Sequence, residues 1–105
     1  MLDALRKGNI ERDKEWAKGE ELSLSFRGNE LAGESGEVCN ELKKLDRHRM
    51  GIAGGKDDIS GLKEELADVM ICIDLIAMDF DIDLGEAVKA KFNKTSQKYG
   101  LSTRM

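Results

Sequence analysis

The chain contains no proline anywhere in its 105 residues, and only five of those residues are aromatic. Small β-sandwiches and barrels usually place proline at turns and edges, and their strands are rich in β-branched and aromatic residues. The composition therefore disfavours those folds and favours helices. A chain of 105 residues is long enough for one domain and too short for two, so we expect a single domain over residues 1–105.

Hydrophobic spacing predicts four helices, over residues 2–16, 22–50, 62–80 and 83–99. The first is highly charged and has few apolar anchors, whereas the second carries a narrow apolar seam on one face. Residues 51–61 contain four glycines and form the one clear break in the pattern. We expect a loop there, with Asp58 or Ser60 available to cap the next helix.

Residues 69–78 of the third predicted helix are apolar on nearly every side. A helix of this kind is usually buried all round, and a chain of this size has little else with which to cover it. We therefore expect this segment to lie at the centre of a bundle or in a subunit interface. The predicted fold class is all-α, a four-helix bundle assembled as an oligomer.

Charge and cysteine content narrow the function classes. The chain has 21 acidic and 17 basic residues, a net charge of −4, which makes it a poor electrostatic partner for nucleic acid or an anionic membrane. Cys39 and Cys72 lack the number and spacing of a disulfide framework, and the charged first turn lacks the apolar core of a signal peptide. We expect a cytoplasmic protein with reduced cysteines that binds neither nucleic acid nor membrane.

Carboxylates gather at two places beside the apolar faces. At 100° per residue, four glutamates of the second predicted helix lie within about 60° of one another: Glu30, Glu34, Glu37 and Glu41. On the third predicted helix, Glu65 and Asp68 are i,i+3 neighbours next to its apolar face. Like charges at these spacings repel, so an acidic stripe beside a core needs protonation or a cation to offset the repulsion.

If the second and third helices pack antiparallel across the loop, the two acidic groups converge. Four oxygen ligands without a nearby histidine or cysteine suit Mg²⁺ or Mn²⁺ rather than zinc or copper. Each group alone is better explained as a solvated helix surface. The two together fit a metal site and a solvated surface about equally well.

The acidic pairs also carry a family resemblance. Glu34-Ser35-Gly36-Glu37 and Glu65-Leu66-Ala67-Asp68 match the Glu-x-x-Glu and Glu-x-x-Asp pattern of the MazG-like family of all-α nucleoside triphosphate pyrophosphohydrolases. Segments 27–34 and 91–100 resemble the small single-domain members from phages and bacteria. The family often has another glutamate where this chain has Gly33, which leaves the site one supporting carboxylate short unless Glu30 replaces it.

The resemblance implies an enzyme that hydrolyses (deoxy)nucleoside triphosphates to the monophosphate and pyrophosphate in nucleotide-pool housekeeping, with Mg²⁺ as cofactor or Mn²⁺ as its substitute. The implied metal ligands, which are also the implied catalytic residues, are Glu34, Glu37, Glu65 and Asp68. Lys91 and Asn93 match the phosphate-contacting tail of the family. Trp16 and Asn29 are candidates to bind the base, although a core role also suits Trp16. Family members of this size form homodimers or homotetramers.

A second class of function is open on the same residues. A helical bundle of this kind could serve as a non-catalytic nucleotide-sensing or protein-interaction module. A sensor would bind nucleotide without cleaving it, and a plain scaffold would gain no stability from Mg²⁺ or Mn²⁺. Metal titration and nucleotide turnover therefore separate these alternatives.

Overall fold

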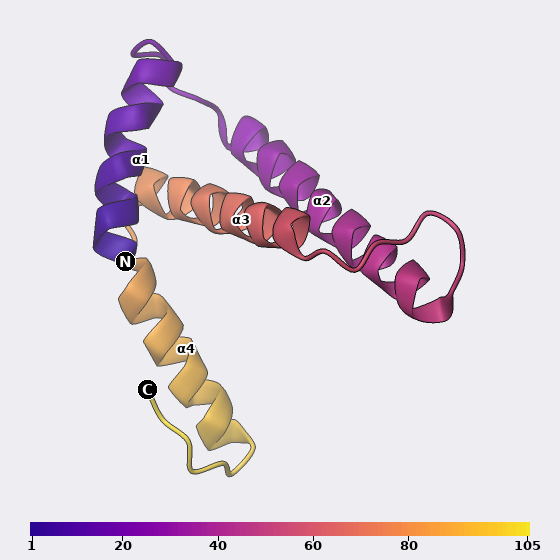
Figure 1. The fold of residues 1–105 in the computed structure, drawn as a ribbon. Coiled ribbons are helices and arrows are strands. Elements are labelled where there is room, and N and C mark those ends of the chain that lie inside the picture. Colours follow the sequence, from indigo (N-terminus) through magenta and orange to yellow (C-terminus); the bar gives the residue numbers. More distant parts are fainter.

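The computed structural model describes residues 1–105, which form four helices and no strand. Figure 1 shows the helices in chain order: α1 (Leu2–Trp16), α2 (Leu24–Met50), α3 (Ser60–Asp79) and α4 (Leu84–Lys98). The all-α prediction is confirmed, and every helix begins and ends within two residues of its predicted bounds. None of the helices is both long enough and apolar enough to cross a membrane.

The helix ends follow from local chemistry. The side chains of Ser23 and Asp83 accept hydrogen bonds from backbone N–H groups three residues on, at the starts of α2 and α4. Asp58 does the same for the first N–H of α3, at 2.9 Å. Gly51 ends α2 with a φ of +69°, in the left-handed region that glycine adopts without steric cost.

Helices α2 and α3 run antiparallel and form the most extensive helix contact of the chain (Figure 1). The loop between them folds back along the last turns of α2, where the Lys56 N–H donates to the Lys44 carbonyl at 3.2 Å. Gly55 lies so close to α2 that a Cβ there would overlap the backbone of His48. The predicted loop therefore has a definite path, held against one helix.

Helix α1 crosses α3 and is tied to it by buried polar contacts. Asp74 lies in the apolar part of α3 and has only 1% of its side chain exposed. Its carboxylate accepts hydrogen bonds from Arg6 at 3.0 Å and from Asn9 at 2.9 Å. Arg27 makes a second tie, since its buried guanidinium binds one carboxylate of α1 and one of α3.

A single chain does not enclose a hydrophobic core. Helix α4 extends away from the other three helices (Figure 1), and only Cys72 and Ala77 are buried among the hydrophobic residues. The radius of gyration is 17.2 Å, against about 13 Å for a compact domain of this length. Within one chain, the apolar segment 69–78 is consequently covered on some sides only. The apolar pattern predicts burial on all sides.

Candidate functional site

The α2–α3 pairing brings together carboxylates from the two acidic groups. Oxygen atoms of Glu34, Glu65 and Asp68 all lie within 4.8 Å of one another. Glu34 and Glu65 are half-buried, and Asp68 is exposed at the edge. We call these three residues the acidic cluster. Their convergence follows from the antiparallel packing, because the middle of α2 then lies beside the first half of α3.

Two other glutamates of the predicted acidic stripe, Glu37 and Glu41, have different surroundings. Glu37 is exposed and lies outside the acidic cluster. Glu41 is buried and forms ion pairs with Lys56 at 2.7 Å and with Lys44 at 3.7 Å. The hydrogen bond from Lys56 is the main cause that lowers the pKa of Glu41. Glu41 therefore needs no metal ion to balance its charge.

No lysine or arginine forms a salt bridge with the acidic cluster. Burial, followed by the charges of Asp68, Glu37 and Glu34, raises the pKa of Glu65. Such mutual repulsion is relieved by protonation or by a cation. The donor set consists of carboxylate oxygens with no nitrogen or sulfur, which is the set that Mg²⁺ and Mn²⁺ prefer, so these residues fit the metal that the resemblance implies.

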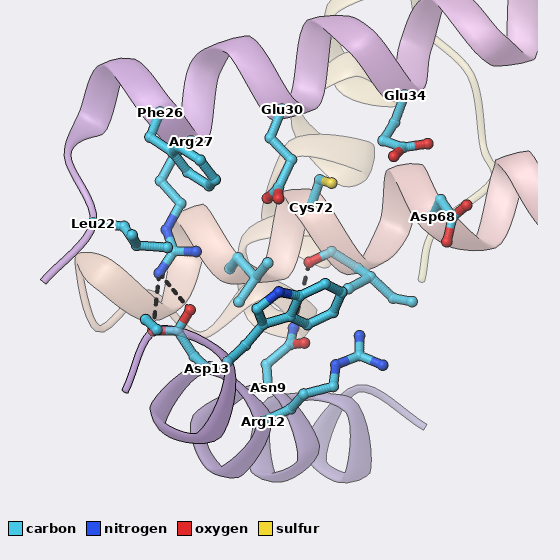
Figure 2. Close-up of a pocket in the computed structure, with 14 residues that line it drawn as sticks. Asn9, Arg12, Asp13, Leu22, Phe26, Arg27, Glu30, Glu34, Asp68 and Cys72 are labelled. Carbon is cyan, nitrogen blue, oxygen red and sulfur yellow. Dashed lines mark hydrogen bonds and ion pairs between the residues drawn. The ribbon is translucent and has the colours of Figure 1, made fainter. Parts of the chain in front are cut away.

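A pocket of about 240 Å³ opens beside the acidic cluster, between α1 and the α2–α3 pair. Glu34 and Asp68 belong to its wall, so the pocket and the cluster are continuous (Figure 2). The wall also contains an aromatic and aliphatic part, made by Trp16, Leu22, Phe26, Ile71 and Leu75. A mostly apolar cavity with charged groups at one end is typical of small-molecule sites.

The buried donors of the pocket are already used within the protein. Arg27, 3% exposed, donates to Asp79 at 2.9 Å and to Asp13 at 3.1 Å. Asn9 donates to the Ile71 carbonyl at 3.3 Å and to the buried aspartate of α3. These residues were not predicted from the sequence. The sequence did contain a signal for them, because Asp74 lies within the apolar segment 69–78 and a buried carboxylate needs a hydrogen-bond donor.

Of the predicted base-binding residues, the structure places one in the pocket. Trp16 lines the pocket, yet 78% of it is exposed, so it has no core role within the chain. The Arg12 guanidinium lies over the indole, 5.9 Å from the ring centroid, within range of a cation–π interaction. Asn29 is exposed and lies outside the pocket wall, where its amide is 3.5 Å from the Ser25 hydroxyl.

The predicted phosphate-contacting residues lie on α4, away from the acidic cluster. Lys91 is exposed, and α4 makes no extensive contact with α2 or α3. The Asn93 amide exchanges two hydrogen bonds with the Met105 backbone, at 2.8 and 3.2 Å. Within one chain, therefore, the structure does not bring Lys91 and Asn93 to the cluster.

The architecture is that of a helical protein with a carboxylate cluster at the edge of an apolar pocket. The family model "MazG nucleotide pyrophosphohydrolase domain" matches residues 25–99, which run from the second residue of α2 through the end of α4. The chain therefore belongs to the MazG nucleotide pyrophosphohydrolase family. Helix α1, which supplies Trp16, lies outside the matched residues.

A curated relative also matches the chain, and its name adds no function. The chain is 31% identical to the Gene 37 protein of Mycobacterium phage L5 over 75 residues, which is 71% of this chain. It spans 65% of the length of that relative. No solved structure matches the chain significantly.

Proposed function

We propose that this protein is a Mg²⁺-dependent hydrolase that converts (deoxy)nucleoside triphosphates to monophosphates and pyrophosphate and serves nucleotide-pool housekeeping. One observation carries the proposal: oxygens of Glu34, Glu65 and Asp68 lie within 4.8 Å of one another at the edge of a 240 Å³ pocket. Membership of the MazG family supports the reaction type.

The side chains have distinct roles in this proposal. The acidic cluster holds the metal, and Glu37, one turn from Glu34, adds a fourth carboxylate nearby. Bound Mg²⁺ would neutralise triphosphate charge and polarise the phosphorus under attack. The aromatic part of the pocket receives the base, where the Trp16 indole offers a stacking surface.

We also propose that the working form is a homodimer or homotetramer, to which α4 contributes Lys91 and Asn93 from a neighbouring copy. The surface area of one chain is 7884 Å², whereas a compact monomer of 11.7 kDa exposes about 5,900 Å². Two copies that covered this excess would bury roughly 4,000 Å² in total, within the range of obligate homodimers. Val88 and Phe92, half-exposed apolar residues of α4, support its role in that contact.

The direct test is pyrophosphate release from a panel of NTPs and dNTPs in the presence of Mg²⁺. Glu65→Gln should lower kcat/KM more than about 100-fold, because loss of residues that merely support a metal ligand already costs 10- to 100-fold. Asp46→Asn removes a carboxylate from an exposed position on α2 and serves as the matched control with unchanged activity. Thermal unfolding should show that metal-free Glu65→Gln stays folded.

Three outcomes contradict the proposal in different ways. Absence of turnover across the whole panel would refute hydrolysis. Nucleotide binding without turnover would support the nucleotide-sensing alternative. Absence of any Mg²⁺- or Mn²⁺-dependent stabilisation would refute the metal site and favour a protein-interaction module.

A further inference from the structure

Glu30 occupies the middle of the pocket wall. It lies on α2 one turn after Phe26 and one turn before Glu34, and successive turns at this spacing are about 6 Å apart. In Figure 2 the Glu30 side chain lies between those of Phe26 and Glu34, and its carboxylate points away from α2 toward Cys72. The pocket therefore has an aromatic level, a Glu30 level and a metal-binding level, in that order along α2.

The Glu30 carboxylate has an unmet capacity to accept hydrogen bonds. Its Oε1 atom is shielded from water and has no donor. The adjacent Cys72 thiol is only a weak donor, and the strong buried donors Arg27 and Asn9 already bind other acceptors. Because Oε1 is shielded from water, the other carboxylate oxygen is the one that a molecule in the pocket can reach. No strong donor of the chain engages this carboxylate, so a bound molecule can supply a hydrogen bond to it.

We propose that Glu30 is a specificity-determining residue that accepts a hydrogen bond from a sugar hydroxyl of the bound nucleotide, an inference that rests on the proposed nucleotide site. The sugar joins the base to the triphosphate. With the base in the aromatic part of the pocket, between Trp16 and Phe26, and the phosphates at Glu34 and Asp68, the sugar falls at the Glu30 level. An ionised carboxylate and a hydroxyl are complementary acceptor and donor.

The test compares three series of nucleotides, each with all four bases: NTPs, 2′-deoxy NTPs and 2′,3′-dideoxy NTPs. The natural chain should favour nucleotides that keep the recognised hydroxyl by about 10- to 100-fold in kcat/KM, as expected for a hydrogen bond to a charged group. The step between series at which the rate falls identifies the 2′- or the 3′-hydroxyl.

Substitution of Glu30 should remove this preference. In Glu30→Ala the ratio should fall to within about twofold of unity, whereas Glu30→Gln, which keeps an uncharged acceptor, should retain an intermediate ratio. Asp46→Ala, which removes an exposed carboxylate from the same helix, should keep the ratio of the natural chain. An unchanged ratio in Glu30→Ala would overturn the proposal.

Two further results would reassign Glu30. A loss confined to nucleotides whose base carries an amino group would place the donor on the base and refute the sugar contact. A fall in Mg²⁺ affinity as large as that of Glu65→Gln, measured by titration calorimetry, would make Glu30 a metal ligand and refute it also.

Binding of α,β-methylene analogues of the same nucleotides separates this inference from the proposed reaction, because it needs no turnover. Binding with the expected hydroxyl preference but without cleavage of the natural nucleotides would refute hydrolysis and support the sugar contact. Cleavage with a preference that Glu30→Ala leaves intact would refute the sugar contact alone. A chain that binds none of the analogues and cleaves none of the natural nucleotides would refute both.

Discussion

The buried carboxylate of Asp74 offers a sharp test of how α1 is attached to the rest of the chain. Its side chain is 1% exposed, whereas that of its partner Arg6 is 22% exposed, and Asn9 donates to it as well. Removing either member of the ion pair breaks the same 3.0 Å contact. The two removals leave different groups behind, so their costs should differ.

Arg6→Met leaves an ionised carboxylate buried with a single neutral donor, which costs about 3–5 kcal/mol in comparable cases. Asp74→Asn leaves the guanidinium, which can be rehydrated from its exposed side, so the cost should be about 1.5–3 kcal/mol, the usual value of hydrogen bonds to a charged group. A chain of this length has a free energy of unfolding of roughly 5–15 kcal/mol. Arg6→Met should therefore lower the midpoint temperature of thermal unfolding by roughly 15 °C or more.

The free energy of unfolding is measured by urea titration with circular dichroism, at one fixed protein concentration because any self-association would add to the apparent stability. Lys7→Met is the matched control, since Lys7 is an exposed cation on the same helix, and its cost should stay within about 0.5 kcal/mol. The double variant of Arg6→Met and Asp74→Leu should recover part of the loss, because it leaves no buried charge.

The test compares the loss of unfolding free energy in Arg6→Met with the loss in Asp74→Asn. If Arg6→Met costs no more than Asp74→Asn, the burial of the carboxylate does not control the energetics, and the reasoning is refuted. A double variant less stable than Arg6→Met alone would contradict it as well. Either result would mean that the aspartate is held by packing rather than by its charge.

Two other parts of the structure give further predictions. Burial and the nearby Glu30 raise the pKa of the Cys72 thiol to about 11, so about one thiol in a thousand is ionised at pH 8. Alkylation at pH 8, followed by mass spectrometry, should modify exposed Cys39 and spare Cys72 until the chain is denatured or the pH approaches 11. Gly55→Ala should destabilise by about 1–3 kcal/mol because its methyl group meets a neighbouring backbone, whereas Gly36→Ala, with open space around it, should stabilise by about 0.5–1 kcal/mol. Urea titrations that give both changes the same sign would contradict this account of the two glycines.

The helices were predictable because their signals are local. Periodic apolar residues, the Asp83 cap and the glycine-rich break at residues 51–61 each act over a few neighbouring positions. The approach of Glu34 to Glu65 and Asp68 was predictable too, given only that two helices joined by a short loop pack antiparallel, whereas Glu37 stays outside that cluster. The metal-binding roles of these residues stay a prediction.

Other properties could not be read from the pattern, because they depend on residues distant in sequence. Glu34 and Glu41 lie on the same face of one helix, and nothing in the spacing distinguishes them. The folded loop brings Lys56 to Glu41 and brings no cation to Glu34. The position of α1 likewise determines which side chains line the pocket, and this position depends on an ion pair and a hydrogen bond between residues more than 60 positions apart.

The sequence by itself determined that this proline-free chain forms four helices, and it located the two acidic groups that match the MazG pattern. Only the tertiary structure decided which carboxylates are left without a cation and that an apolar pocket adjoins them. The physical reason is range: backbone hydrogen bonding and capping act within a few residues, whereas charge pairing and cavity shape are set by how helices cross.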